Sequence, residues 1–307
     1  MFIAPPRHPI RPVLPLRDGV GPSCIALPAL GQGTLLDFLA QQMPNVGHNQ
    51  WQQRIEAGDV VDEWGVAVTV QRAFKGGLRL YYYRSLPAEP EIPFQEAVLY
   101  QDAHLLVADK PHFLPVTPSG RYLQQTLLVR LKQRLDLPEL SPLHRIDRDT
   151  AGLVLFSVQR ATRGCYQALF RDRAIAKEYE AVAPWCAEGN FPREYHSRLE
   201  ESPQFFRMHE VPGEPNTCTH IEQIEIAGHW ARYRLRPVTG KRHQLRVQMA
   251  ALGAPLRHDA LYPVVNDAPE GDFSQPLQLL ARSLAFTDPV TGQARYFESA
   301  RTLLALV

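Results

Sequence analysis

The 307-residue chain has only four cysteines, and they form no C-x-x-C pair. Cys24, Cys165, Cys186 and Cys218 are widely scattered, which argues against both a zinc site and a disulfide framework. No other run of residues has the spacing of a metal site. We therefore expect no bound metal, and free thiols suited to a reducing cytoplasm.

The chain also lacks a long apolar run. No stretch is long and apolar enough to span a bilayer. The first residues, Met-Phe-Ile-Ala-Pro-Pro-Arg-His, do not place a basic segment before a continuous apolar one, as a secretory signal would. We expect a soluble protein without a membrane partner.

A third absence is excess charge of one sign, because the formal net charge is +1 and the sequence pI is about 7.8. Any nucleic acid would therefore have to be bound by locally clustered Arg and Lys. Hydrophobic residues make up 45% and charged residues 21%, which is typical of a folded globular protein. The length favours one large domain with a smaller one attached.

The N-terminal part divides into an arm and a small module. Residues 1–32 are dense in proline, which disfavours helices and removes strand donors, so we expect an extended arm lying on the next domain. In residues 33–84, apolar residues recur twice at helical spacing before Gly58. Short β-prone runs follow at 60–61, 66–70 and 78–83.

Residues 85–93 are rich in proline and charge, and they are expected to be a linker to a larger domain over 94–307. That domain opens with a buried-strand pattern that ends at Pro111. It then alternates expected helices with strands, with helices at 126–135 and 159–171 and strands at 152–156 and 176–183. No repeated nucleotide-binding βαβ unit is visible. The fold class is therefore predicted as α+β, around a mixed, largely antiparallel sheet.

Three segments of this domain could carry chemistry, and the first contains Asp147. It lies in His-Arg-Ile-Asp-Arg-Asp at 144–149, directly before the apolar strand. One interpretation is a surface salt-bridge cluster with Arg145 and Arg148, which would contribute little. The other is a functional carboxylate, because the edge of a buried strand can fix a side chain while leaving it open to a ligand.

The second segment, residues 238–246, is expected to be a turn followed by a helix that reaches Leu252 and ends at Gly253. Arg242 and Arg246 are four residues apart, so we expect them to share one helix face, where they could pair with a carboxylate and with phosphates. The alternative is a solvated basic face.

The third segment is Lys177-Glu178-Tyr179 on an expected strand. Strand alternation points Lys177 and Tyr179 to one face, together with Ala181. Tyr179 could equally be a core residue, because a strand tyrosine is more often structural than catalytic.

Together these segments resemble the RluA family of pseudouridine synthases, over residues 98–298. The family's His-Arg-Leu-Asp and Thr-Ser-Gly-Leu stand here as His-Arg-Ile-Asp at 144–147 and Thr-Ala-Gly-Leu at 150–153. Its Lys-x-Tyr is at 177–179, and its Thr-Gly-Arg-x-His-Gln-Leu-Arg is Thr-Gly-Lys-Arg-His-Gln-Leu-Arg at 239–246. Residues 105–111 and 288–292 resemble the family's opening strand and closing hairpin. Departures at Thr117, Ala151, Lys241, Gln248 and 257–259 bear on substrate choice more than on activity.

The resemblance implies isomerisation of specific uridines to pseudouridine in ribosomal or transfer RNA. It assigns Asp147 as the nucleophile on a flipped-out uridine, Arg246 as the cation that orients it, and Tyr179 as a stacking residue and possible proton relay. Substrate-binding roles fall to His144, Arg145, Lys177, Arg242, His243 and Leu245, with Arg145 filling the gap that the base leaves. An isomerisation needs no cofactor, and a monomer is expected. Residues 34–70 are similar to the helix-pair RNA-binding module that often precedes this domain, although Arg54 is the clearest cation of its second helix.

Two other functions stay open at this point. A non-catalytic RNA-binding protein would keep the basic segment and lose Asp147, Tyr179 or Arg246, all of which are present. A nucleoside or glycoside hydrolase would need a second carboxylate, for which Asp149 is the candidate. Asp149 and Thr150 are explained more simply as turn residues that precede the strand.

Overall fold

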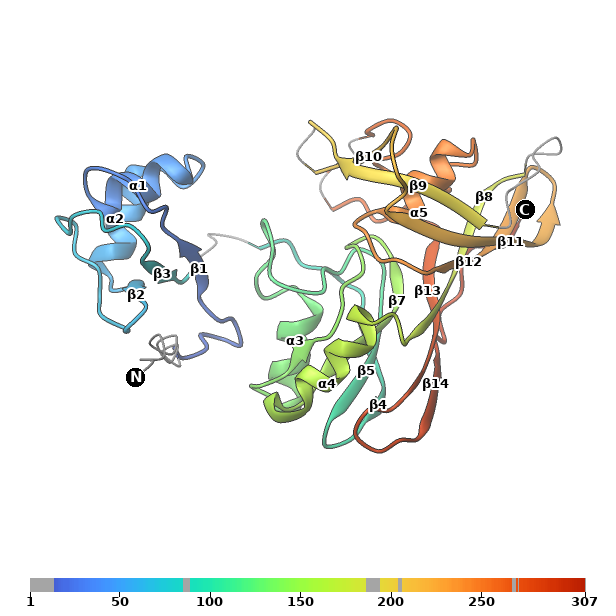
Figure 1. Cartoon of the computed structure of the whole chain (residues 1–307), viewed down its shortest axis with the longest axis horizontal. Helices are drawn as coiled ribbons and strands as arrows, with labels where there is room; N and C mark the ends of the chain where they lie inside the picture. Colours follow the sequence, from blue (N-terminus) through green and yellow to red (C-terminus); the bar gives the residue numbers. More distant parts are fainter. Residues whose placement is uncertain are drawn as a thin grey trace, which may run out of the picture. The chain divides into compact units, whose positions relative to one another are not determined.

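The computed structural model describes residues 14–84, 89–185, 194–203, 206–266, 269 and 271–306. The chain forms two compact units, Met1–Ala88 and Glu89–Val307, each of which has its own core (Figure 1). Within the described residues, every helix is too short or too polar to cross a membrane. Cys24, Cys165 and Cys218 are free thiols, and Cys186 lies outside the described part of the chain.

The first unit is a helix pair beside a small sheet. Helices α1 (Leu35–Gln42) and α2 (His48–Glu56) accompany strands β1 (Ser23–Ala26), β3 (Arg79–Tyr82) and β2 (Val60–Asp62), which form an antiparallel sheet in that order. Thr34 and Asp37 begin α1 with a reciprocal capping box. The two expected helices are confirmed, and Leu39 and Trp51 are fully buried between them and the sheet.

Three boundaries in this region differ from the expectation. Strand β1 lies within the proline-rich arm, because Pro22 and Pro28 flank the strand rather than interrupt it. Residues 66–70 make only an isolated bridge, since Asp62 closes a tight turn by accepting hydrogen bonds from the backbone of Trp64 and Val66. Residues 89–93, expected as linker, pack on the second unit, where Ile92 is 1% exposed. Residues 1–13 and 85–88 lie outside the description.

The second unit is built on one large sheet with the strand order β10-β9-β11-β12-β8-β13-β7-β5-β4, to which β14 and β6 add at β13 and β7. All pairs are antiparallel except β7 with β13, so the predicted α+β class with a mixed, largely antiparallel sheet is confirmed. The strands are β4 (Ala97–Gln101), β5 (Leu105–Lys110), β6 (Ser141–Pro142), β7 (Ala151–Ser157), β8 (Ala176–Pro184), β9 (Glu194–Glu201), β10 (Met208–Val211), β11 (Thr217–Ala227), β12 (Trp230–Pro237), β13 (Leu279–Thr287) and β14 (Ala294–Glu298).

Helices cover both faces of the sheet around β5 and β7, and for this reason these two strands are buried along their whole length. Helix α3 (Leu127–Leu135) packs on the face that carries Leu106 and Phe156, whereas α4 (Arg160–Arg171) packs on the face of Leu105 and Leu155. Figure 1 shows both helices beside this part of the sheet. A site at the end of these strands therefore rests on a base that is packed on both faces.

Helix α5 (Gln244–Ala251) packs on another part of the sheet, against β8, β11, β12 and β13. Leu245 and Met249 point into that core, where they belong to the same buried cluster as Ala181 of β8. Tyr179 packs against the same cluster, which confirms the alternation expected along this strand.

The parallel pair joins Ala151 and Gly152 of β7 to Leu280 and Ala281 of β13. Gly152 has a φ of +109°, and a Cβ added there would lie 2.2 Å from the carbonyl oxygen of Ala281. Only glycine fits this approach. The pairing fixes the beginning of β7, and with it the end of the segment 143–150 that precedes the strand.

Candidate functional site

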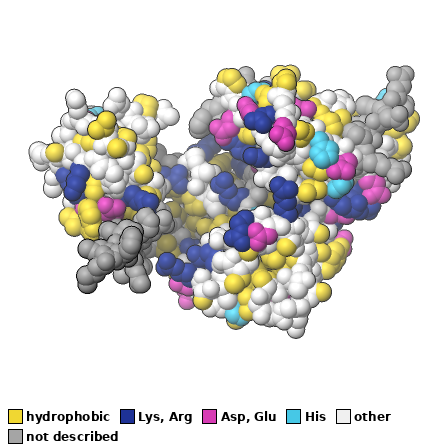
Figure 2. Space-filling model, in the orientation of Figure 1, with side chains coloured by type: hydrophobic (Ala, Val, Ile, Leu, Met, Phe, Trp, Pro, Cys, Tyr) yellow, Lys and Arg dark blue, Asp and Glu magenta, His cyan; other side chains and the backbone are white. Residues whose placement is uncertain are grey.

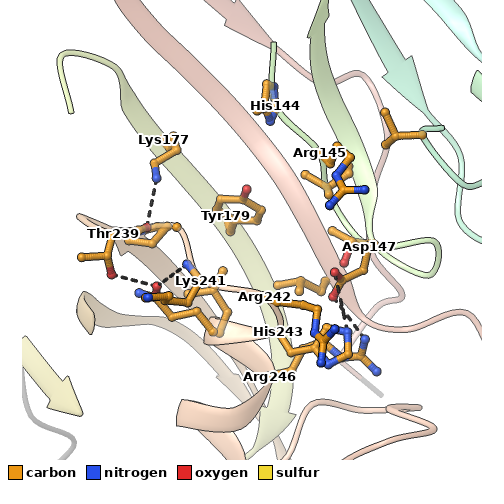
Figure 3. A pocket seen from close by; sticks show the side chains of 18 of the residues that line it. His144, Arg145, Asp147, Lys177, Tyr179, Thr239, Lys241, Arg242, His243 and Arg246 are labelled. Atoms are coloured by element: carbon orange, nitrogen blue, oxygen red, sulfur yellow. Dashed lines mark hydrogen bonds and ion pairs between the residues drawn. The ribbon is translucent and has the colours of Figure 1, made fainter. Parts of the chain in front are cut away.

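A cavity of about 810 Å³ opens in the second unit, between the segment before β7, strand β8 and the turn before α5. All nine residues that the sequence singles out for catalysis or substrate binding line it: His144, Arg145, Asp147, Lys177, Tyr179, Arg242, His243, Leu245 and Arg246 (Figure 3). Segments that lie far apart in the sequence therefore meet at one site.

The segment that carries Asp147 is anchored by the end of strand β5 and by the residues directly after it. The Lys110 ammonium donates hydrogen bonds of 2.9 Å to the carbonyl oxygens of Arg148 and Pro111. Nδ1 of His112 lies 2.7 Å from the carbonyl oxygen of Asp149. Burial lowers the pKa of Lys110 to about 7, against the opposing charges of Asp149 and Asp147. The backbone directly after Asp147 is thus anchored at two successive carbonyls.

His144 anchors the same segment from its other end. Its Nε2 accepts a 3.1 Å hydrogen bond from the backbone N–H of Leu155, and its ring stacks on Phe170 with centroids 4.7 Å apart. Burial, with a smaller contribution from Lys177, lowers the pKa of His144 to about 3, so the ring is neutral. His144 lines the cavity with its ring while its acceptor nitrogen is used by the backbone.

Asp147 meets Arg246 at the centre of the site. Oδ2 of Asp147 lies 3.2 Å from Nη1 of Arg246 (Figure 3). The same guanidinium donates two further hydrogen bonds to the Asp259 carboxylate, one of 2.8 Å from Nε and one of 2.6 Å from Nη2. The side chains of Arg246 and Asp259 are 2% and 0% exposed, whereas that of Asp147 is 25% exposed. The arrangement is a buried ion pair that presents one outer carboxylate to the cavity.

The neighbouring carboxylates keep Arg246 in its charged form. Burial alone would favour the neutral form, but hydrogen bonds and charge from Asp259, followed by the charges of Asp147 and Asp149, raise the pKa of Arg246 above its usual value. Arg246 is therefore a permanent cation, 3.2 Å from one carboxylate oxygen of Asp147.

His243 lies beside Arg246 and faces the other carboxylate oxygen of Asp147 (Figure 3). Its Nε2 is 3.9 Å from Oδ1 of Asp147, and its Nδ1 is 2.8 Å from the hydroxyl of Tyr262. Burial lowers the pKa of His243. The Tyr262 hydroxyl accepts a 2.8 Å hydrogen bond from the backbone N–H of Met208, and its own proton is available to donate to Nδ1 of His243. In the tautomer that accepts this proton, the imidazole N–H is at Nε2, the nitrogen that faces Asp147.

Tyr179 lies between Lys177 and Asp147 in the view of Figure 3. Burial, and then the charge of Asp147, raise the pKa of Tyr179 above its usual value, so its phenol stays protonated. It can donate a hydrogen bond or offer its ring for stacking, but it is no base in the resting site. Lys177 donates a 3.1 Å hydrogen bond to the carbonyl oxygen of Thr239, which ties β8 to the turn before α5.

The expectation that Arg242 and Arg246 share a helix face is wrong. Helix α5 begins at Gln244, and His243 takes the left-handed conformation at its N-terminus with a φ of 54°. Arg242 therefore lies in the turn, where its Nη2 donates to the carbonyl oxygen of Arg207 at 3.2 Å and its Nη1 is 3.8 Å from Glu201. Its side chain is 42% exposed. Only Arg246 reaches the buried carboxylates.

The surface-cluster interpretation of Asp147 also fails, because the ion pairs among the described residues join Arg148 to Asp149 and join Asp147 to Arg246. Asp147 is the only carboxylate among the described residues that line the cavity, and the other charged lining residues are cations: Arg145, Arg148, Arg173, Lys177, Lys241, Arg242 and Arg246. Figure 2 shows Lys and Arg side chains gathered around a hollow of the second unit. A polyanion would be attracted to this cavity despite the small net charge.

Asp259, Tyr262 and Lys110 belong to the site without having been singled out from the sequence. Lys110 carries a visible signal, because it ends a strand that begins with four apolar residues, and a charge buried there must be paired or functional. Asp259 stands where the family usually has Gly-Asp. Tyr262 gives no such signal, because its hydroxyl meets His243 only through the fold.

Comparison with known proteins agrees with this geometry. Residues 104–251 match the family model of RNA pseudouridylate synthase. An uncharacterized RNA pseudouridine synthase of Synechocystis is 32% identical over 74% of this chain and 79% of its own length. The dual-specificity RNA pseudouridine synthase RluA of Escherichia coli is 33% identical over 69% of this chain and 94% of its own. The solved structure of human RNA pseudouridylate synthase domain containing 1 superposes with a TM-score of 0.55 at 20% identity, over 70% of this chain and 86% of that one, and so shares the fold.

Proposed function

Since the chain belongs to the RluA family of RNA pseudouridine synthases and isomerises uridine in RNA, we propose that Asp147 is its nucleophile, with Arg246 and Tyr179 as its catalytic partners. The observation that carries the proposal is the position of Asp147: it is the only carboxylate among the described lining residues, and it is held 3.2 Å from a buried arginine. A carboxylate nucleophile needs a fixed direction, and a cation beside it provides one.

The reaction breaks the bond from ribose to the base nitrogen, turns the base, and joins ribose to a base carbon. An ionised carboxylate can drive it by forming a covalent adduct with the sugar or with the base. Atoms and electrons balance, because the proton on base carbon 5 is lost to solvent once the new glycosidic bond has formed and the base nitrogen that leaves the ribose takes up a proton. The reaction therefore requires no net transfer of electrons or groups to the enzyme.

The target uridine has to leave its stack before Asp147 can reach it, at a cost of about a few kcal/mol. Tyr179 supports this step, since its ring borders the cavity beside Asp147 and its phenol remains protonated. Arg145 is exposed at the rim and makes no ion pair within the described residues, so it is available to fill the gap that the base leaves. His144, Lys177, His243 and Leu245 shape the remaining walls.

The hydrolase alternative requires a second carboxylate in the cavity, and Asp149 does not provide it. Asp149 is held by Arg148 at 2.8 Å and does not line the cavity, so among the described residues no second acid is opposite Asp147. A paired-carboxylate glycosidase would place two carboxyl groups on either side of the scissile bond. The site supports isomerisation better.

We also propose ribosomal or transfer RNA as the substrate class, a monomeric enzyme and a cytoplasmic location. The cations around the cavity suit phosphate groups, and free thiols suit a reducing compartment. The first unit is proposed to position the RNA rather than to supply affinity. Arg54, the clearest cation of its second helix, is only 8% exposed and lies 5.1 Å from the Trp51 ring, so it is not available for a phosphate contact.

The test is the matched pair Asp147→Asn and Asp149→Asn. Tritium release from RNA that carries uridine labelled at base carbon 5 measures the reaction. Asp147→Asn should abolish release and retain the circular dichroism spectrum, while Asp149→Asn, which removes a neighbouring charge outside the cavity, should retain at least a measurable rate. Near-normal release by Asp147→Asn would overturn the assignment.

A further inference from the structure

Strands β9 and β11 bring four potential metal ligands onto one face of the sheet, away from the catalytic cavity. Glu194 and His196 are two apart on β9, so their side chains share a face. Cys218 and His220 share a face on β11 in the same way. The antiparallel register sets His196 directly opposite Cys218, and Glu194 directly opposite His220.

Three of these side chains are already in contact. Oε1 of Glu194 accepts a hydrogen bond of 3.3 Å from the Cys218 thiol and lies 2.8 Å from Nε2 of His196. The ligand atoms of these three residues all lie within 4.8 Å of one another. Two ligands of a tetrahedral zinc ion, with bonds of about 2.0–2.3 Å, are roughly 3.4–3.6 Å apart. The three atoms can therefore take up that spacing through small side-chain movements.

We propose that Glu194, His196 and Cys218 form a zinc site, with His220 placed to supply the fourth ligand. A thiolate, imidazole nitrogens and a carboxylate are the donor types that Zn²⁺ prefers, whereas Mg²⁺ and Ca²⁺ prefer oxygen alone. On binding, the Cys218 thiol gives its proton to solvent, and the ion takes the place of the hydrogen bonds to Glu194.

This inference departs from the sequence-based expectation of no metal. That expectation depended on the spacing of cysteines along the chain, and Cys218 has no second cysteine near it. The partners of Cys218 come instead from the neighbouring strand, 24 residues away in the case of Glu194. Spacing rules for metal sites do not detect ligands that pair across strands.

The site would serve structure rather than chemistry, because none of the four residues lines the catalytic cavity. The backbone of Cys218 nevertheless holds the turn before α5. Its N–H donates to Oγ1 of Thr239 at 3.1 Å, and its carbonyl oxygen accepts from Nε2 of Gln244 at 3.1 Å. A metal that joins β9 to β11 would stiffen the strand on which this turn rests.

Cobalt binding to the full chain tests the proposal directly. Metal-free protein titrated with Co²⁺ should develop a thiolate-to-cobalt absorption band in the near ultraviolet together with the visible bands of tetrahedral cobalt. The bands should saturate at one ion per chain. Zn²⁺ should displace the cobalt, and its affinity, measured by competition with a chromophoric chelator, should be weakened at least about 100-fold by Cys218→Ser, since even an outer-shell partner is worth 10–100-fold.

Two further variants keep the outcome decisive. A chain with Cys24, Cys165 and Cys186 replaced by serine should keep the cobalt bands, because Cys218 is then its only thiol. If Cys218→Ser fails to fold, His196→Ala gives the same comparison with the thiol retained, and it should weaken zinc binding and lose the tetrahedral bands. Absence of binding by the full chain, bands that survive in folded Cys218→Ser or His196→Ala, or bands lost from the triple-serine chain would each overturn the site.

Discussion

Asp259 accepts two hydrogen bonds of 2.6 and 2.8 Å from Arg246, and both are shorter than the 3.2 Å contact between Arg246 and Asp147. Asp259 is 0% exposed and also accepts hydrogen bonds from the backbone N–H groups of Leu261 and Tyr262. The carboxylate that lies farther from the cavity is thus the one that sets the direction of the arginine. Nη1, the one guanidinium nitrogen of Arg246 that does not bond Asp259, makes the contact with Asp147.

Asp259→Asn should therefore damage catalysis without touching the cavity. We expect turnover to fall on the order of 10²-fold, because a misplaced Arg246 no longer orients Asp147. Stability should fall by about 3–5 kcal/mol, since the variant leaves a buried cation short of its partner. Tritium release per folded molecule and urea denaturation measure the two effects.

Asp288→Asn is the matched control. Asp288 is also 0% exposed and pairs with Arg295, but it lies outside the cavity. The Asp288→Asn variant should be less stable than the native chain but should keep the native turnover per folded molecule. Equal turnover in the two variants would contradict the positioning role of Asp259.

The two arginines of the turn and helix should separate binding from turnover. Arg246→Ala should reduce turnover at saturating RNA on the order of 10²-fold or more and leave RNA affinity nearly unchanged. Arg242→Ala, at a 42% exposed position, should weaken RNA binding and lower the slope of log affinity against log salt by about one phosphate contact. Binding isotherms at several salt concentrations and single-turnover rates make the comparison. An equal loss of affinity in both, with turnover intact, would contradict this division.

Lys110 should make stability depend on pH in an unusual window. Its pKa is lowered to about 7 in the folded protein, from about 10.5 in the unfolded chain. Between these values the unfolded chain binds more protons, so the Lys110 contribution to stability rises with pH, by at most about 1.4 kcal/mol per pH unit. Below pH 7 both states hold the proton and the contribution is constant.

The measurement is urea denaturation of the native chain and of Lys110→Met at pH 6, 7.5 and 9. The variant loses the hydrogen bonds to Pro111 and Arg148 at every pH, which shifts its stability by a constant amount. The native chain should gain on the variant by about 2 kcal/mol between pH 7.5 and 9. Two stability curves that run parallel over this range would show that Lys110 titrates normally.

Gly152→Ala should be strongly destabilising, by more than about 2 kcal/mol, because its φ is +109° and its new Cβ would meet the Ala281 carbonyl oxygen at 2.2 Å. Gly164→Ala is the matched control within helix α4, where an added Cβ meets nothing within 4 Å. That change should stabilise by about 0.4–1 kcal/mol. Thermal melting of both variants checks the prediction, and similar melting temperatures would contradict it.

Much of the second unit could be predicted from sequence because its strands and helices have strong local patterns. The apolar run before Pro111 predicted β5, and the run after Thr150 predicted β7. The family motifs identified all nine of the residues that were expected to line the cavity. What could not be predicted depends on tertiary pairing. The first turn of α5 begins after His243 rather than before Arg242, and Asp259 meets Arg246 only because the segment after α5 folds back.

The boundary between the two units also needed the structure. Proline suggested a linker up to residue 93, but the Glu89 carboxylate accepts hydrogen bonds of 2.8, 2.9 and 2.6 Å from the backbone N–H groups of Leu123, Gln124 and Gln125. Ile92 is buried in the core under α3. Composition alone does not reveal that a charged, proline-rich segment packs on a domain.

A chain truncated to begin at Glu89 should therefore fold and keep Asp147, Tyr179 and Arg246 assembled. We expect it to modify natural RNA more slowly or less selectively, because the first unit no longer positions the substrate. Beginning at Glu91 instead should lower the melting temperature, since the Glu89 contacts are lost. Circular dichroism melting and site-resolved pseudouridine mapping make the comparison. A folded truncation with unchanged rate and site choice would show that the first unit does not guide the RNA.

The parallel pairing of β7 with β13 joins two segments that are made at different times during synthesis of the chain. Asp147 and the start of β7 are made near the middle of the chain, but Leu280 and Ala281, which pair with Ala151 and Gly152, are made some 130 residues later. Synthesis at about 5–20 residues per second separates the two by many seconds. During that interval the ribosome-bound chain carries Asp147, which we propose as its nucleophile, without the strand that anchors it, so we expect no modification of nearby RNA until nearly all of the sequence has emerged.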